Sequence, residues 1–212
     1  CSSDLNPPVP FVCAGQLFCF NHGAFDAEGD SLVYSLITPA TSSTATVTYL
    51  GGYSAAQPLT SSPPMTFDTQ TGDICMTPTN SGEVTVMAVL VEEWRNGVLI
   101  GKVRRDIQIN VISCSNTLPE VTGFDGNPPT PSNTQIIICA GSTVNETINS
   151  FDADGGQVVT MTWNNGIPSA TFTVSGSPYP TGNLTWTPAP ADVSNVPYCF
   201  TVAVQDDNCP YN

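Results

Sequence analysis

The chain contains one sequence pattern twice, at a constant spacing. The tripeptide Cys-Ala-Gly begins at Cys13 and again at Cys139. A second segment, Phe-Asp-Ala followed by an acid and Gly, begins at Phe25 and again at Phe151. Both segments return after 126 residues. A repeat at a fixed spacing indicates that one structural unit is used twice.

The repeat continues further along the chain. Residues 72–78 match residues 182–188, and residues 87–93 match residues 201–207. The segments 87–93 and 201–207 both end in two acidic residues. The 212 residues are enough for two domains of about 100 residues, each with its own core. Tandem units of this size are typical of stalks and adhesive arrays rather than of active sites.

Charge excludes several classes of partner. Four basic residues face eighteen acidic ones, for a net charge of −14. Phosphate binding depends on Lys and Arg, so we expect neither nucleic acid nor an anionic membrane surface as a partner. No run of 18 apolar residues occurs, so direct membrane insertion is not expected. Acidic clusters suit hard cations instead.

Strand signals dominate the chain. Leu32, Tyr34 and Leu36 alternate with other residues, as do Ile107, Ile109 and Val111, and this period of two places one face of a strand on a core. Asn96 and Gly97 separate two apolar runs, and Asn-Gly favours a type I′ hairpin turn. The basic residues gather around this hairpin, where we expect a solvated face balanced by acids: Arg95, Lys102, Arg104 and Arg105 against Glu92, Glu93 and Asp106.

The prediction is an all-β chain of two tandem antiparallel β-sandwich modules, Ig-like or cadherin-like in the loose sense. Residues 1–9 are expected to be the tail of a preceding module and residues 10–115 the first sandwich. Residues 116–134, rich in Pro and Asn, are expected to be a semi-stiff linker. Residues 135–212 form the second module, which we expect to be incomplete because nothing after Asn212 matches the strand at 98–114.

Eight cysteines without a Cys-x-x-Cys pair indicate disulfides and an oxidising compartment. A zinc site is disfavoured, because zinc sites use closely spaced Cys and His and this chain has one His. Cys19 and Cys75 have no counterparts in the second unit, where Asn145 and Thr185 stand in their places. Residues lost together are expected to be partners, so we predict a Cys19–Cys75 bridge.

The other cysteines are paired by the same reasoning. The first unit has Thr85 and Arg95 where the second has Cys199 and Cys209, which predicts a Cys199–Cys209 bridge. The four that remain precede or open a unit, and the repeat favours the bridges Cys1–Cys13 and Cys114–Cys139. The rival pairing is Cys13 with Cys114, which closes the first unit on itself.

Acidic loops make calcium a candidate ligand. Asp26, Glu28 and Asp30 have a spacing that can turn three carboxylates toward one point, and calcium accepts six to eight such oxygens with loose geometry. Glu92 and Glu93 could supply the other side. The second unit offers Asp152, Asp154, Asp206 and Asp207, but Gly156 replaces its third acid, so a weaker site is expected there. The alternative is that both loops are polar turns.

Catalysis finds little support in the sequence. His22 is the only histidine, and no Gly-x-Ser-x-Gly surrounds a serine. A catalytic pair of carboxylates, as in glycosidases, is an alternative that the sequence leaves open because acidic residues are plentiful. We expect a protein that is not an enzyme, with His22 in a loop or at an edge, hydrogen-bonded locally.

The segments at 19–36, 71–78 and 96–101, with 139–141, 151–155 and 198–202 in the second unit, resemble repeats of very large surface adhesins from gliding Bacteroidetes. The resemblance implies export by the type 9 secretion system, an extracellular location and cadherin-like or PKD-like modules. It also implies a filament moved along the cell or attached to a substratum. The implied partners are neighbouring repeats of the same chain, surface polysaccharide or substratum, and the gliding or secretion machinery.

A different class of function is a carbohydrate-binding accessory module of an exported multidomain protein. Sugars stack on exposed aromatic faces, so the exposure of the tryptophans discriminates between an adhesive segment and a carbohydrate-binding module. The candidates are Trp94, Trp163 and Trp186, and each lies on an expected strand, where core packing is the simpler role.

Overall fold

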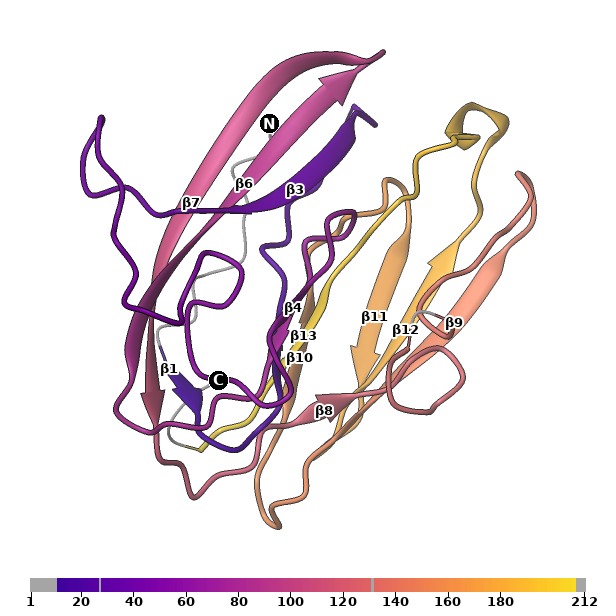
Figure 1. Ribbon diagram of the computed structural model, residues 1–212. Coiled ribbons are helices and arrows are strands. Elements are labelled where there is room, and N and C mark those ends of the chain that lie inside the picture. The colour runs from indigo at the N-terminus through magenta and orange to yellow at the C-terminus, as the bar shows by residue number, and fades with distance from the viewer. Residues whose placement is uncertain (1–10, 27, 131, 209–212) are drawn as a thin grey trace. The chain divides into compact units, whose positions relative to one another are not determined.

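The computed structural model describes residues 11–26, 28–130 and 132–208 (Figure 1). Its architecture is all-β, as predicted, with one short 3-10 turn at Pro190–Asp192. The chain divides into two compact units, Cys1–Ser115 and Asn116–Asn212, and each is described by itself. Within the described residues, no helix has the length and apolar character needed to cross a lipid bilayer. The predicted tail at 1–9 lies outside the described residues.

Unit 1 is built from a four-stranded and a three-stranded sheet. The larger sheet has the order β1 (Phe11–Cys13), β7 (Val98–Ile112), β6 (Val84–Arg95), β3 (Ser31–Ile37). The smaller has the order β2 (Phe18–Phe20), β5 (Ile74–Met76), β4 (Thr66–Phe67). β1 runs parallel to β7, a pairing that the sequence does not predict, and the other pairs are antiparallel.

One apolar core joins the two sheets of unit 1. Val12, Val89 and Ile109 come from the larger sheet, Ile74 and Met76 come from the smaller, and all are almost fully buried in one cluster. The alternation seen in the sequence therefore has the expected cause, because every second side chain of these strands faces the other sheet. Unit 1 is a two-layered β-sandwich.

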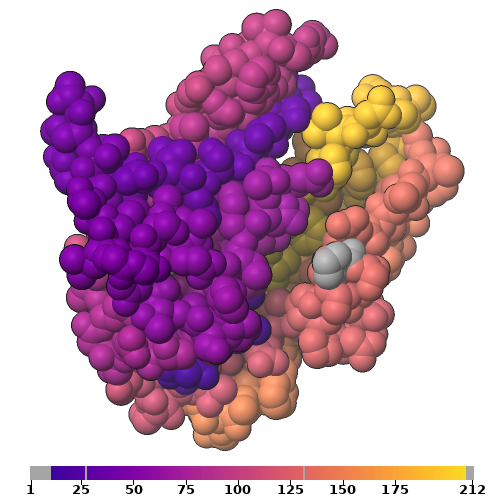
Figure 2. Space-filling model, viewed as in Figure 1, coloured from indigo at the N-terminus to yellow at the C-terminus, as the bar shows by residue number. Residues whose placement is uncertain are grey.

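The long β6–β7 hairpin turns at Asn96 and Gly97, as predicted. Both residues have positive φ, 51° and 77°, which is the backbone that a type I′ turn requires. The space-filling view in Figure 2 shows the tip of this hairpin projecting beyond the rest of unit 1. On its faces Lys102 pairs with Glu92 at 2.6 Å, and Arg104 pairs with Asp106 at 3.0 Å, so this part of the basic cluster is balanced by acids as expected.

Unit 2 contains a four-stranded sheet and a separate strand pair. The sheet has the order β11 (Thr171–Ser175), β12 (Thr181–Trp186), β9 (Val144–Phe151), β8 (Glu120–Val121). The pair is β10 (Thr160–Trp163) with β13 (Val202–Gln205). Ile148, Met161 and Leu184 are its buried apolar side chains on β9, β10 and β12.

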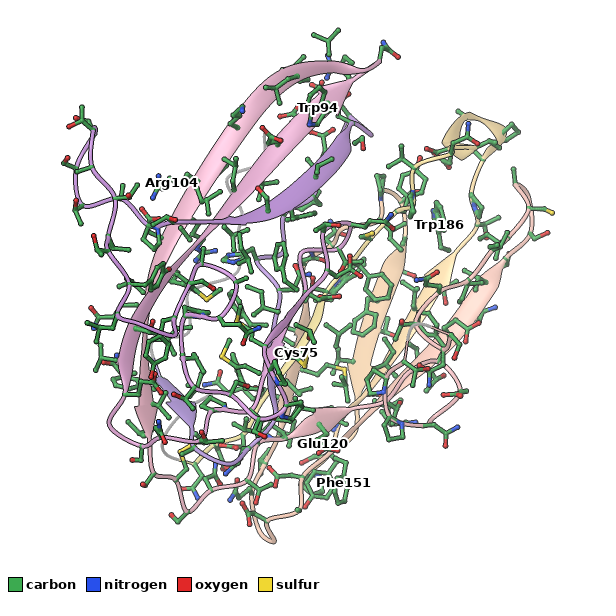
Figure 3. The ribbon with its side chains drawn as sticks, in the orientation of Figure 1. Cys75, Trp94, Arg104, Glu120, Phe151 and Trp186 are labelled. Carbon is green, nitrogen blue, oxygen red and sulfur yellow. A yellow bond between two sulfur atoms is a disulfide. The ribbon has the colours of Figure 1, made fainter. Side chains whose placement is uncertain are left out.

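The prediction of a linker at 116–134 is wrong. Glu120 lies opposite Phe151 in the β8–β9 pair, as the labelled side chains in Figure 3 allow the reader to follow. Asn116 is buried and its side-chain amide donates to Asp206 at 2.7 Å. The prolines indicated an extended spacer, but Glu120 and Val121 are not prolines and form the strand β8. Within this segment, β8 is an edge strand of the four-stranded sheet of unit 2.

The sequence repeat corresponds to a repeat of strand register. Tyr34 faces Val91 in the β3–β6 pair, and Thr160 faces Gln205 in the β10–β13 pair. These positions are 126 and 114 residues apart, which are the two offsets found in the sequence. The β2–β5 pair of unit 1 and the β9–β12 pair of unit 2 also have the same register as each other. The two units are therefore one strand arrangement used twice, with β2, β3, β5 and β6 answering to β9, β10, β12 and β13.

Candidate functional site

The acidic loop of unit 1 closes on itself around Asp26. Its carboxylate accepts hydrogen bonds from the backbone N–H groups of Glu28 at 2.9 Å and Asp30 at 3.0 Å. Glu93 reaches the same place from β6, where it lies opposite Leu32. Asp26, Asp30 and Glu93 bring one carboxylate oxygen each within 4.8 Å of one another. These three acids, called the acidic cluster below, are the part of the predicted ligand set that the structure brings together.

Arg95 holds one side of the acidic cluster. Its guanidinium donates to Asp30 from Nε at 2.9 Å and from Nη2 at 2.6 Å, and Nη2 also contacts Glu28. The hydrogen bond from Arg95 lowers the pKa of Asp30, and the same contact raises the pKa of Arg95. The basic cluster as a whole was expected to be balanced by Glu92, Glu93 and Asp106, but Arg95 pairs with Asp30 and Glu28. The β6–β7 turn aims it at the acidic loop instead.

Glu93 is the buried member of the acidic cluster. Its side chain is almost excluded from solvent, and this burial raises its pKa, with further contributions from Asp26 and from a hydrogen bond with Asp30. Carboxylates held this close disfavour one another's charge. A bound cation would remove that repulsion, so the cluster is electrostatically suited to a hard cation.

The other two predicted ligands of unit 1 are engaged elsewhere. Glu28 has an exposed side chain that pairs with Arg95, and Glu92 pairs with Lys102 across the β6–β7 hairpin. Both acids were predicted as calcium ligands on spacing alone. The side chains of Glu92 and Glu93 alternate on β6, so only Glu93 faces the acidic loop.

The acids of unit 2 are arranged differently. Asp152 accepts the N–H of Asp154 at 2.8 Å, as Asp26 does for Glu28, but Asp152 and Asp206 are almost fully buried. Asp154 accepts from the backbone N–H of Thr117 at 2.6 Å, and Asp207 from that of Val158 at 2.9 Å. Among the described residues of unit 2, no three carboxylates come as close as in unit 1.

One observation in unit 2 nonetheless fits a cation. Oδ2 of Asp152 is buried and has no hydrogen-bond partner in the described part of the chain. Asn116, which the sequence did not single out, is almost fully buried beside these acids and binds Asp206 and Gln157. Asn116 follows directly on Cys114 and Ser115 in a segment taken for a linker, so no sequence signal marked it.

In ligand type, unit 1 fits calcium, which prefers carboxylate oxygens. Two features limit this fit: the number of carboxylates and competition from Arg95. Three carboxylates are fewer than the six to eight oxygens that calcium takes, so waters or carbonyls would have to complete the shell. Arg95 also supplies Asp30 with positive charge already. Calcium would be held chiefly through Asp26 and Glu93, sharing Asp30 with the guanidinium.

Two disulfides occur among the described residues. Cys19–Cys75 is confirmed. Cys13 is joined to Cys114, so the predicted bridges Cys1–Cys13 and Cys114–Cys139 are wrong and the rival pairing is right. The physical reason is the parallel β1–β7 pair, which sets Cys13 opposite Ile112, two residues before Cys114.

Four cysteines remain, and two of them lie outside the described residues. Cys139 has an exposed thiol with no disulfide partner among the described residues. Cys1 and Cys209 lie outside the described residues, so the Cys199–Cys209 bridge stays a prediction. The two observed disulfides are typical of proteins outside the reducing cytosol.

Two of the three tryptophans contact other aromatic rings. Trp163 stacks on Phe172 with ring centroids 5.4 Å apart, and Trp186 meets Tyr198 edge-on at 5.2 Å. Trp94, near the end of β6, buries its indole nitrogen (Figure 3). All three are half-buried. Each therefore has a packing role in its own unit.

His22 lies in a loop after β2, one of the two positions predicted for it, but it is buried and the predicted local hydrogen bonds are not found among the described residues. It is 1% exposed, its ring packs edge-on against Phe20 at 5.0 Å, and neither ring nitrogen has a hydrogen-bond partner in the described part of the chain. Burial, with a smaller contribution from the charge of Arg105, lowers its pKa to about 4. His22 is a neutral core residue at physiological pH.

The site and fold define a class of protein: an all-β chain with two disulfides among its described residues and an acidic cluster in unit 1. No known family model matches the chain, and no curated protein matches it.

Proposed function

We propose that this chain is a structural and adhesive segment of a large exported cell-surface protein, built from tandem Ig-like or cadherin-like modules. The proposal rests on two features. One strand register is used twice along the chain, as in an array of repeated modules. Unit 1 contains two disulfides, and disulfides form and persist in oxidising surroundings such as the cell exterior.

The Cys13–Cys114 disulfide is the observation that carries the proposal. It joins the end of β1 to the residue two places after β7, and so closes unit 1 into one covalent loop between cysteines with a sequence separation of 101. A pull along the chain enters at Cys13 and leaves at Cys114 through the disulfide. The sandwich inside the loop carries no load. A filament under drag or attachment would benefit from this property.

When the Cys13–Cys114 disulfide is reduced, the terminal strands of unit 1 would still resist a pull. Phe11 lies opposite Asn110 and Cys13 opposite Ile112 in the parallel β1–β7 pair. In a parallel pair, a pull on the start of one strand and the end of the other slides the strands past each other. All the inter-strand hydrogen bonds then bear the load together rather than one after another.

Calcium is proposed as a stiffening ligand of unit 1, bound by the acidic cluster of Asp26, Asp30 and Glu93. The cluster spans the loop before β3 and the end of β6, so a bound ion would tie the loop to the sheet. In unit 2, Asp152 with Asp206 would form a second, weaker site, supported by the buried and unpartnered Oδ2 of Asp152.

The proposed location is extracellular, with neighbouring repeats and a substratum or surface polysaccharide as partners, together with the gliding or secretion machinery. A net charge of −14 keeps such an array soluble and argues against nucleic acid. A non-enzymatic role is supported by His22, whose burial removes the one imidazole from contact with a substrate.

The alternative, a carbohydrate-binding accessory module, is favoured less. Sugar binding needs an aromatic face open to solvent, and Trp163 and Trp186 pack against other rings. Trp186 is the best remaining candidate, because it is half-buried and its partner Tyr198 meets it edge-on.

The test uses the cells that make the protein. An antibody against residues 11–208 should label intact cells without permeabilisation, and deletion of the coding gene should reduce attachment to glass or movement over it. Label that appears only after permeabilisation would contradict the proposal. Binding of the purified chain to one glycan on an array, lost in Trp186→Ala and kept in Trp94→Ala, would favour the carbohydrate-binding alternative.

A further inference from the structure

One face of the four-stranded sheet of unit 2 is covered by threonine and asparagine. β9, β12 and β11 lie side by side (Figure 1), and successive side chains on each strand point to opposite faces. Ile148 and Leu184 are buried on the inner face. The outer face, called the Thr/Asn face below, consists of four rows that follow the strand register: Thr143 with Thr187; Asn145, Thr185 and Thr171; Thr147, Asn183 and Thr173; and Asn149, Thr181 and Ser175. All are exposed except Thr181 and Asn183 on β12, which are half-buried.

Hydrogen bonds between side chains join the strands in every row. Thr185 donates from Oγ1 to Oδ1 of Asn145 at 2.9 Å, and Thr147 donates in the same way to Asn183 at 3.1 Å. The first and last rows add two contacts: Thr143 with Thr187 at 2.7 Å, and Thr181 to Asn149 at 3.2 Å. Cross-strand ladders of this kind stabilise flat sheets and restrict the side chains that form them. The polar atoms of the Thr/Asn face therefore have fixed positions.

The Thr/Asn face is uncharged, although the chain has eighteen acidic residues. The ladder engages the side-chain oxygens of Asn145, Asn149 and Asn183, and their amide nitrogens form no hydrogen bond within the part of the chain that the structure describes. These NH₂ groups can donate to whatever covers the face, and the threonine oxygens can accept. The acid Glu120 lies beyond the last row, opposite Phe151, where the face ends.

The array is a property of unit 2 and not of the shared fold. At corresponding positions unit 1 has an exposed leucine, a disulfide and an acid: Leu17, Cys19–Cys75 and Asp73. Asparagine is also depleted in strands, so strand propensity does not explain three of them in one strand pair. Neither the repeat nor local structure accounts for the Thr/Asn face, which leaves contact with a partner as the reason for it.

The spacing of the Thr/Asn face suits a crystalline partner. Its rows repeat about every 6.4–6.8 Å along a strand and its strands about every 4.7–4.9 Å, so the hydroxyl and amide groups form a grid with two fixed periods. Hexagonal ice presents an uncharged grid of hydrogen-bond donors and acceptors with periods of similar size. A sugar chain repeats in one direction only and stacks on aromatic rings, which the four rows lack. A charged surface would find no opposite charge on this face.

We propose that the Thr/Asn face of unit 2 binds ice. The threonine hydroxyls and asparagine amides hold a first layer of water at fixed positions, and this layer continues the ice lattice. Water that bridges polar groups in this way binds nearly as well as a direct hydrogen bond. The activity goes beyond the adhesive role, because it belongs to unit 2 and requires neither export nor a neighbouring module.

The first experiment measures the uptake of the protein into ice. An ice crystal grows slowly in a stirred solution of the purified chain, and the protein concentration is compared between the melted crystal and the remaining liquid. The parent should be retained in the ice, whereas a protein without an ice-binding face is pushed into the liquid. Small ice crystals grown in the same solution should develop facets instead of rounded edges.

Two variants disrupt the Thr/Asn face by different means. Thr185→Tyr places a ring at an exposed position on β12, the middle of the three strands, where it holds ice away from the neighbouring side chains. Asn183→Asp keeps the size of the side chain and the acceptor for Thr147, but adds the charge that Asp73 has in unit 1. Both variants should lose retention in ice. Because Asn183→Asp is nearly isosteric, it keeps the test decisive if circular dichroism shows that Thr185→Tyr does not fold.

Thr162→Tyr is the matched control. Thr162 is an exposed threonine on β10, outside the four rows, so this variant should enter ice as the parent does. Exclusion of the parent from ice, or equal retention of the parent and Asn183→Asp, would overturn the proposal. Binding of the parent to insoluble cellulose but not to ice, lost in Asn183→Asp, would assign the face to a neutral polysaccharide instead. Failure in ice leaves the adhesive role intact, because that role is tested separately on cells.

Discussion

Thr185 donates a hydrogen bond from Oγ1 to Oδ1 of Asn145 at 2.9 Å, across the pair of strands β9 and β12. In unit 1 the same two register positions hold Cys19 and Cys75, which form a disulfide. A covalent cross-strand link in one unit thus corresponds to a hydrogen bond in the other. The backbone at this position accommodates either.

This correspondence predicts that the disulfide can be transferred. In the double variant Asn145→Cys, Thr185→Cys a disulfide should form in air and stabilise unit 2 by about 2–4 kcal/mol, because it restricts the unfolded chain. Non-reducing peptide mapping and thermal unfolding with and without reductant measure it. In the offset pair Asn145→Cys, Asn183→Cys the residues are not opposite, and no bridge should form. Persistently free thiols in the first variant would refute the shared register.

Calcium should raise the melting temperature of unit 1. An ion present at 100 times its dissociation constant, bound only to the folded state, stabilises that state by about 2.7 kcal/mol. Asp26→Ala should remove most of this gain, because it takes away a ligand and the acceptor that shapes the loop. Asp152→Ala in unit 2 should leave the gain of unit 1 unchanged. Calorimetry in calcium and in chelator is the measurement.

Arg95 gives a sharper control for the calcium site. Arg95→Met removes the guanidinium that competes for Asp30, so it should tighten calcium binding while lowering stability in chelator. Identical melting of the parent in calcium and in chelator would show that the acidic cluster is an ordinary ion-paired turn.

His22 should make the protein sensitive to acid. Its pKa is about 4 in the folded protein and 6.5 as a free group, so the unfolded chain binds the proton more tightly between these values. Stability is therefore unaffected by His22 above about pH 6.5 and falls as pH drops toward 4, by at most about 3 kcal/mol. In His22→Leu, the free energy of unfolding measured with urea should depend less steeply on pH between pH 8 and pH 4. An equal slope in both proteins would contradict the burial of His22.

Gly72 and Gly82 test the packing of the unit 1 core. Both have positive φ, 78° and 87°, so an Ala at either position carries a similar backbone cost. A Cβ at Gly72 would come 2.6 Å from the ring of the buried Tyr34, whereas a Cβ at Gly82 would meet nothing within 4 Å. Gly72→Ala should therefore cost about 1–3 kcal/mol more than Gly82→Ala in chemical unfolding. Equal losses would mean that Tyr34 is not packed on Gly72.

Much of the fold could be predicted because the repeat and the strand patterns are local. Asn96 and Gly97 adopt the φ values that their turn requires, and the joint loss of Cys19 and Cys75 marked a cross-strand pair. The Cys13–Cys114 bridge was not favoured, because it depends on β1 lying parallel to β7, a contact between distant segments that no spacing reveals.

The candidate site was predictable only in part, for the same reason. The spacing of Asp26 and Asp30 is local and was informative. The choice of Glu93 over Glu92 depends on which face of β6 meets the loop, and the pairing of Arg95 with Asp30 spans 65 residues. The segment at 116–134 was misjudged because its prolines outweighed the two-residue strand and the buried Asn116.

In the proposed role, the Cys13–Cys114 disulfide carries force along the chain past the folded strands of unit 1. Single-molecule stretching of the chain from its two ends tests this claim most directly. Without reductant, unit 1 should release almost no length. With reductant, the stretch from Cys13 to Cys114, a sequence separation of 101, should add about 35 nm at 3.3–3.6 Å per residue. Equal released lengths in the two conditions would contradict the claim.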